Sequence, residues 1–92
     1  MPRFHALIRG RVQGVFFRAS IVELARSLGL KGWVRNRFDG SVEVVAEGDA
    51  AAIEALRGYC KKGPADAIVR DLEIIDEPET GEFHAFGVRS EA

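Results

Sequence analysis

Cysteine, histidine and long apolar stretches are scarce in this sequence, and each shortage excludes a class of protein. The single cysteine, Cys60, cannot form an intrachain disulfide, and two histidines are too few for a recognisable zinc-binding pattern. The longest apolar run is Ala50 to Ile53, far short of the ~20 residues of a transmembrane helix or the ~7–15 of a signal-peptide core. We therefore expect a cytoplasmic protein with no bound metal and no membrane segment.

Charge is distributed unevenly along a chain that is otherwise typical of one globular domain. Of its 92 residues 47% are apolar and 29% charged, and the formal net charge is −1. Residues 1–37 hold eight basic residues and one acidic residue, whereas the remainder holds five basic and thirteen acidic residues. The near-neutral total argues against nucleic acid as a partner, while the basic first third suits a small anion. The alternative is that two faces of opposite charge are simply solvated.

Hydrophobic spacing predicts five strands and two helices. Phe4 to Val12 alternates between apolar and polar side chains, which is typical of a half-buried strand. Apolar residues recur at helical spacing from Ile21 to Leu28, and Gly29 ends that helix. Asp39-Gly40 predicts a two-residue hairpin turn. The expected strands are 4–12, 33–38, 41–47, 67–75 and 83–88; the expected helices run from about 18 to 28 and from Asp49, as N-cap, to 61–64.

The order strand, helix, strand, strand, helix, strand is that of the ferredoxin-like βαββαβ sandwich, an α+β fold. We expect an antiparallel sheet of four to five strands with two helices on one face.

The two expected helices begin differently. Asp49 can accept hydrogen bonds from the first turn of the second helix. The first helix follows Gln13-Gly14-Val15-Phe16-Phe17 and opens near Arg18, so it has no capping side chain and carries a cation where an anion is favoured. A glycine-containing loop leading into a helix N-terminus and an arginine is suited to bind phosphate or carboxylate. The alternative is that water solvates this turn and Arg18 points outward.

Two longer runs make the sequence similar to a known family. They are residues 10–18, GRVQGVFFR, and residues 32–43, GWVRNRFDGSVE, continuing to Gly48. The two runs resemble the two signatures of the acylphosphatase family, in the family's order and spacing. Gly63-Pro64 and the strand after it also fit, so the resemblance implies a single acylphosphatase-like domain over residues 1–92. The segment 86–89, FGVR, lacks the closing tyrosine that many members carry.

The resemblance also implies a site and a reaction. It places catalytic roles on Arg18 and Asn36, and it places the phosphate-binding loop on Gln13, Gly14, Val15, Phe16, Phe17 and Arg18. The implied reaction is hydrolysis of small acyl phosphates to a carboxylate and inorganic phosphate, with no cofactor and no metal. Arg18 and the loop would bind the phosphoryl group, and Asn36 would position the water. We further expect a monomer, with inorganic phosphate or sulfate as a competing anion.

Other interpretations stay open at this point. An RNA-recognition module shares the element order, but it should show an aromatic motif and a basic surface that are not evident here. A non-catalytic or regulatory acyl-phosphate-binding module is the stronger alternative, although the presence of both Arg18 and Asn36 favours an enzyme. His5 and His84 are interpreted as strand residues and Cys60 as a small buried hydrophobe. Without the resemblance, Asn36 would be taken for an ordinary strand or turn residue.

Overall fold

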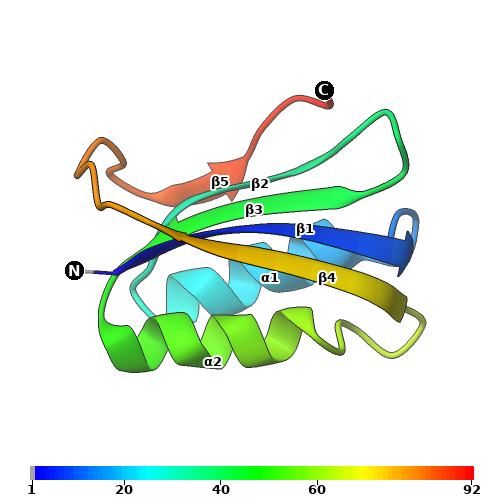
Figure 1. Ribbon diagram of the computed structural model, residues 1–92, viewed down its shortest axis with the longest axis horizontal. Coiled ribbons are helices and arrows are strands. Elements are labelled where there is room, and N and C mark those ends of the chain that lie inside the picture. The colour runs from blue at the N-terminus through cyan, green and yellow to red at the C-terminus, as the bar shows by residue number, and fades with distance from the viewer. Residues whose placement is uncertain (1) are drawn as a thin grey trace.

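Five strands form one sheet in the computed structural model, which describes residues 2–92, and two helices cover one face of that sheet (Figure 1). The elements, in chain order, are β1 (Arg3–Arg11), α1 (Phe17–Ser27), β2 (Lys31–Asn36), β3 (Val42–Glu47), α2 (Ala50–Cys60), β4 (Ile68–Glu77) and β5 (Phe86–Val88). The order and the two layers are those predicted for a ferredoxin-like α+β fold.

The sheet has the strand order β4-β1-β3-β2-β5. The pairs β1–β3, β1–β4 and β2–β3 are antiparallel, as predicted, but β5 runs parallel to β2, so the sheet is mixed. The reason is the path of the chain after β4. It reverses direction through residues 78–85 and crosses to the opposite edge of the sheet, where β2 runs antiparallel to β3 and therefore in the direction of the returning chain. Arg26 of α1 holds β5 there, because its Nε donates to the Phe86 carbonyl at 3.0 Å.

The core lies between the sheet and the helices. The inward positions of β1 are Phe4, Ala6 and Ile8, which are fully buried, and the alternation predicted from the sequence is confirmed there. Cys60 of α2 is buried in the same cluster, as expected for a small hydrophobe. Burial raises the pKa of its thiol to about 12, so the thiol is protonated and unreactive at neutral pH.

One turn, one helix cap and the place of one histidine differ from the sequence-based expectation. The predicted two-residue hairpin turn at Asp39-Gly40 is wrong: Arg37 N–H donates to the Ser41 carbonyl, so the loop comprises residues 38–40. Gly40 closes it with φ 92°, and Asp39 Oδ1 accepts from both N–H and Oγ of Ser41. Such a loop is a type I turn followed by a left-handed glycine. Asp49 precedes α2 but makes no side-chain capping bond, and His84 lies just before β5 instead of within it.

The sheet face away from the helices carries a network of ion pairs. Its members are Arg3 with Glu47 and Glu77 (both 2.9 Å), His5 with Glu43 (2.5 Å) and Glu77 (3.2 Å), and Arg35 with Glu43 (2.6 Å). Burial by itself raises the pKa of Glu43, but hydrogen bonds from Arg35 and His5 outweigh it and the pKa lies below its ordinary value. His5 thus has two acidic partners, Glu43 and Glu77, that the sequence did not reveal. All three side chains lie on the sheet face opposite α1.

Candidate active site

The loop between β1 and α1 has an unusual backbone. Gly14 has φ 74° and Phe16 has φ 66°, and Phe16 is the only non-glycine residue of positive φ among residues 2–92. A left-handed conformation costs a bulky residue about 1–3 kcal/mol. Phe16 is also the N-cap of α1, which has no side-chain cap and no acidic residue in its first turn. The uncapped helix start expected from the sequence is therefore present, on a strained loop.

Several hydrogen-bond donors at the start of α1 have no acceptor in the described part of the protein. Within the described chain, none of the backbone N–H groups of residues 14–19 donates to a protein acceptor; the first such bond runs from Ser20 N–H to the Phe16 carbonyl. Arg18 is exposed and makes no ion pair or hydrogen bond with any residue of 2–92. Free amides, the positive end of the helix dipole and a guanidinium all favour binding of an anion.

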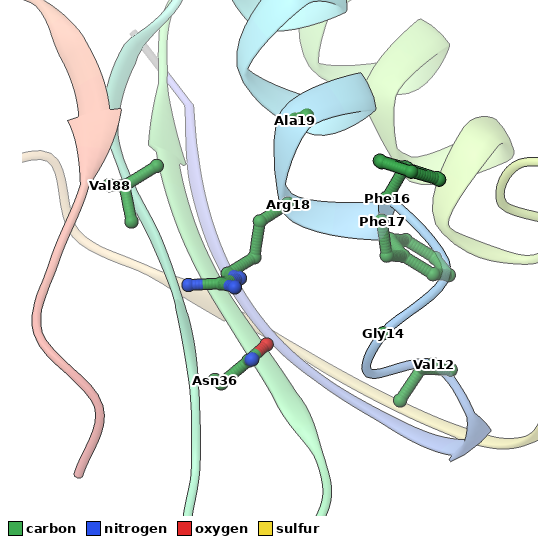
Figure 2. Close-up of a pocket in the computed structure, with 8 residues that line it drawn as sticks. All are labelled: Val12, Gly14, Phe16, Phe17, Arg18, Ala19, Asn36 and Val88. Atoms are coloured by element: carbon green, nitrogen blue, oxygen red, sulfur yellow. The ribbon is translucent and has the colours of Figure 1, made fainter.

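Asn36, the last residue of β2, faces this helix start. Figure 2 shows the Asn36 and Arg18 side chains pointing toward one another, from β2 and from the first turn of α1. Asn36 Oδ1 is buried and has no hydrogen-bond partner. An unsatisfied buried polar atom costs about 1–3 kcal/mol, so it indicates a water or ligand atom that completes the bond. The Asn36 backbone is held in place, since its carbonyl accepts from Ala92 N–H at 3.2 Å.

These groups share one cavity of about 360 Å³ (Figure 2). Its lining residues are Val12, Gly14, Phe16, Phe17, Arg18, Ala19, Asn36 and Val88. Sequence reasoning named five of them and missed Val12, Ala19 and Val88. Val12 and Ala19 flank the predicted phosphate loop, residues 13–18, and could have been found by extending that loop by one residue at each end, whereas nothing in the sequence places Val88 of β5 here.

The other two members of the predicted phosphate loop do not line the cavity. Val15 is buried against the core, and Gln13 turns its side chain toward the β2–β3 hairpin. Gln13 Nε2 donates to the Arg37 carbonyl at 2.7 Å and to the Ser41 carbonyl at 2.9 Å. The Gln13 side chain therefore joins the loop before α1 to the hairpin that follows Asn36, a role that the sequence did not indicate.

Residues 2–92 show no metal-binding cluster and no membrane-spanning helix. No cluster of three or more histidine, cysteine or acidic side chains in this part of the chain is arranged to hold a metal ion. None of the helices in the same residues has the length and apolar character needed to cross a membrane.

Comparison with known proteins decides which family carries this site. The sequence model of the Acylphosphatase family matches residues 4–88 of this chain. The chain belongs to the acylphosphatase family. It is 52% identical over 88 residues to the acylphosphatase of Methylococcus capsulatus, covering 96% of each chain. It is 53% identical over 90 residues to that of Aeropyrum pernix, covering 97% of this chain and 89% of the relative. Its activity is therefore that of an acylphosphatase, an enzyme that acts on small acyl phosphates.

Solved structures agree with this assignment. The crystal structure of acylphosphatase from Bacillus subtilis superposes with a TM-score of 0.91 at 34% identity, covering 97% of this chain and 99% of that one. Full-length HypF, solved in a phosphate- and nucleotide-bound form, matches with a TM-score of 0.87 at 27% identity. That match covers 98% of this chain but only 12% of HypF. The ferredoxin-like fold predicted from the element order is confirmed.

Proposed function

We propose that Arg18 and the backbone N–H groups of the loop before α1 bind the phosphoryl group of an acyl phosphate, and that Asn36 positions the attacking water. The observation that carries this proposal is the unpartnered Oδ1 of Asn36, a residue that lines the same cavity as Arg18 and the residues at the start of α1. We also propose that residues 1–92 form one domain, because a single core cluster includes residues of the sheet and of both helices.

The chemistry needs few protein groups. Water attacks phosphorus, the bond from phosphorus to the bridging oxygen breaks, and the carboxylate departs with the electron pair, so that the products are RCOO⁻ and H₂PO₄⁻. A carboxylate whose conjugate acid has a pKa near ~4 leaves without a general acid. The transition state mainly requires positioning and stabilisation of the equatorial oxygens. The planar guanidinium of Arg18 and preorganised amides are suited to that task.

Asn36 suits the water for a related reason. Its amide offers both an acceptor and a donor, whereas a carboxylate at the same place would bring negative charge beside the phosphoryl group. Because Oδ1 has no protein partner, it is free to accept a hydrogen bond from the water. Asn36 would then orient the nucleophile without contributing to phosphate affinity.

The two roles are separable by experiment. Arg18→Ala should lose phosphate binding and turnover together, because Arg18 contacts the phosphoryl group in both the ground state and the transition state. Asn36→Ala should bind phosphate nearly as the wild type does, while kcat for benzoyl phosphate falls by about 10²–10³. Calorimetric titration of phosphate and steady-state kinetics on the same samples measure both quantities.

Arg9→Ala is the matched control for loss of an arginine. Arg9 is on β1, pairs with Asp71 at 3.4 Å and does not line the cavity, so the variant should resemble the wild type in both assays. Retained kcat in Asn36→Ala would show that Asn36 is only a packing residue. Retained phosphate affinity in Arg18→Ala would remove the proposed anion site.

A further inference from the structure

The cavity has an apolar side that binding of phosphate does not use. Besides Arg18 and Asn36, every side chain in its lining is apolar. Two of these apolar side chains are largely solvent-exposed: Phe16 at 79% and Val88 at 55%. Figure 2 shows them on opposite sides of Arg18, one at the start of α1 and the other on β5. Two exposed apolar groups therefore flank the position proposed for the phosphoryl group.

Packing does not account for the Phe16 ring. The neighbouring Phe17 fills the core, with 1% exposure and an edge contact to Tyr59, so Phe16 adds nothing to the helix–sheet interface. Its backbone is in the left-handed region at φ 66°, which glycine adopts without strain. A large ring is thus present at a position where both exposure and backbone strain disfavour it.

The size and charge of the cavity indicate what lies beside the phosphoryl group. By the about 30 Å³ that a water molecule occupies in the liquid, the five heavy atoms of a phosphate fill less than half of the 360 Å³. Arg18 is the only charged side chain in the lining. A second anionic group on the substrate would find no cation of its own there and would compete with the phosphoryl group for Arg18.

We propose that Phe16 and Val88 bind the acyl group, so that the enzyme prefers acyl phosphates with an apolar, aromatic acyl group to those with a short or anionic one. This inference rests on the proposed function, which places the phosphoryl group at Arg18 and the loop. An aromatic acyl group would contact the Phe16 ring on one side and the Val88 methyl groups on the other. An acetyl group is too small to bury either side chain.

Comparative kinetics test the preference. The quantity to measure is kcat/KM for benzoyl, acetyl and succinyl phosphate, expressed as the benzoyl:acetyl and benzoyl:succinyl ratios. Phe16→Ala should lower both ratios about tenfold, because an aromatic contact is lost. Val88→Thr, which keeps the β-branched shape but replaces a methyl with a hydroxyl, should lower them about threefold. Competitive inhibition by inorganic phosphate should not change in Val88→Thr, since phosphate has no acyl group.

Ile75→Thr is the matched control. Ile75 is also β-branched and 55% exposed, but it lies on β4 and does not line the cavity, so both ratios should equal the wild-type values. A ratio within twofold of wild type in either Phe16→Ala or Val88→Thr overturns the acyl-binding role. A wild-type enzyme that favours succinyl phosphate over benzoyl phosphate overturns it as well. Failure of the proposed function looks different, because Arg18→Ala would then keep its phosphate affinity whichever acyl group is preferred.

Discussion

Removing the Gln13 side chain tests whether its bonds to the β2–β3 hairpin position the proposed anion-binding loop. Gln13 Nε2 donates to the carbonyls of Arg37 and Ser41. Each carbonyl keeps one further bond, from Gly40 N–H and Arg37 N–H respectively. Gln13→Ala therefore loses two bonds without leaving an orphaned acceptor, and at about 0.5–1.5 kcal/mol per bond it should lower the free energy of unfolding by about 1–3 kcal/mol. For a domain of this size, that loss is a decrease in Tm of roughly 4–24 °C.

The assay compares the stability of Gln13→Ala with its phosphate affinity. Urea unfolding gives the free energy of unfolding, and calorimetry gives Kd for phosphate. Gln13→Glu should be less stable than Gln13→Ala, because a carboxylate would face two carbonyl oxygens, and its added negative charge should weaken phosphate binding further. Ser27→Ala is the control: it removes one exposed bond within α1 and should change stability by less than about 0.5 kcal/mol. If Gln13→Ala is fully stable but binds phosphate weakly, Gln13 contacts the anion directly and the tether is refuted.

Three further predictions concern ligands and pH. Phosphate at one hundred times Kd should stabilise the fold by about 2.7 kcal/mol, and a melting curve that does not move with phosphate would argue against the anion site. Hydrolysis of benzoyl phosphate should survive EDTA, whereas loss of activity that magnesium restores would contradict the proposed mechanism. The lowered pKa values of Glu43, Glu47 and Glu77 stabilise the folded state above the ordinary carboxyl range, and this stability should be lost as pH falls below about 4.5. Acid titration of unfolding should show a smaller loss for Glu43→Gln, and an equal loss would exclude Glu43 as a source.

Local sequence signals predicted the elements well and their ends less well. The predicted alternation in β1 and the predicted apolar spacing in α1 are confirmed, because both elements bury their apolar side chains against one shared core. The hairpin turn and the cap at Asp49 were wrong in detail, because short polar side chains have several nearby partners of similar energy. Asp39, for example, binds Ser41 and thereby supports a longer loop than its dipeptide suggested.

For the site, the sequence by itself determined that α1 starts uncapped next to Arg18, since that requires only the residues on either side of the helix start. It named Asn36 through the family motif and not through any physical signal, because a single asparagine carries no local indication of its partner. Only the tertiary structure decided that Asn36 faces Arg18, that Gln13 holds the hairpin and that Val88 completes the cavity. Val88 reaches the cavity because the chain after β4 crosses to the edge of the sheet where β5 pairs with β2. Asn36 and Gln13 come near their partners because β1 and β2 both pair with β3. Such pairings depend on the energy of the whole packed core.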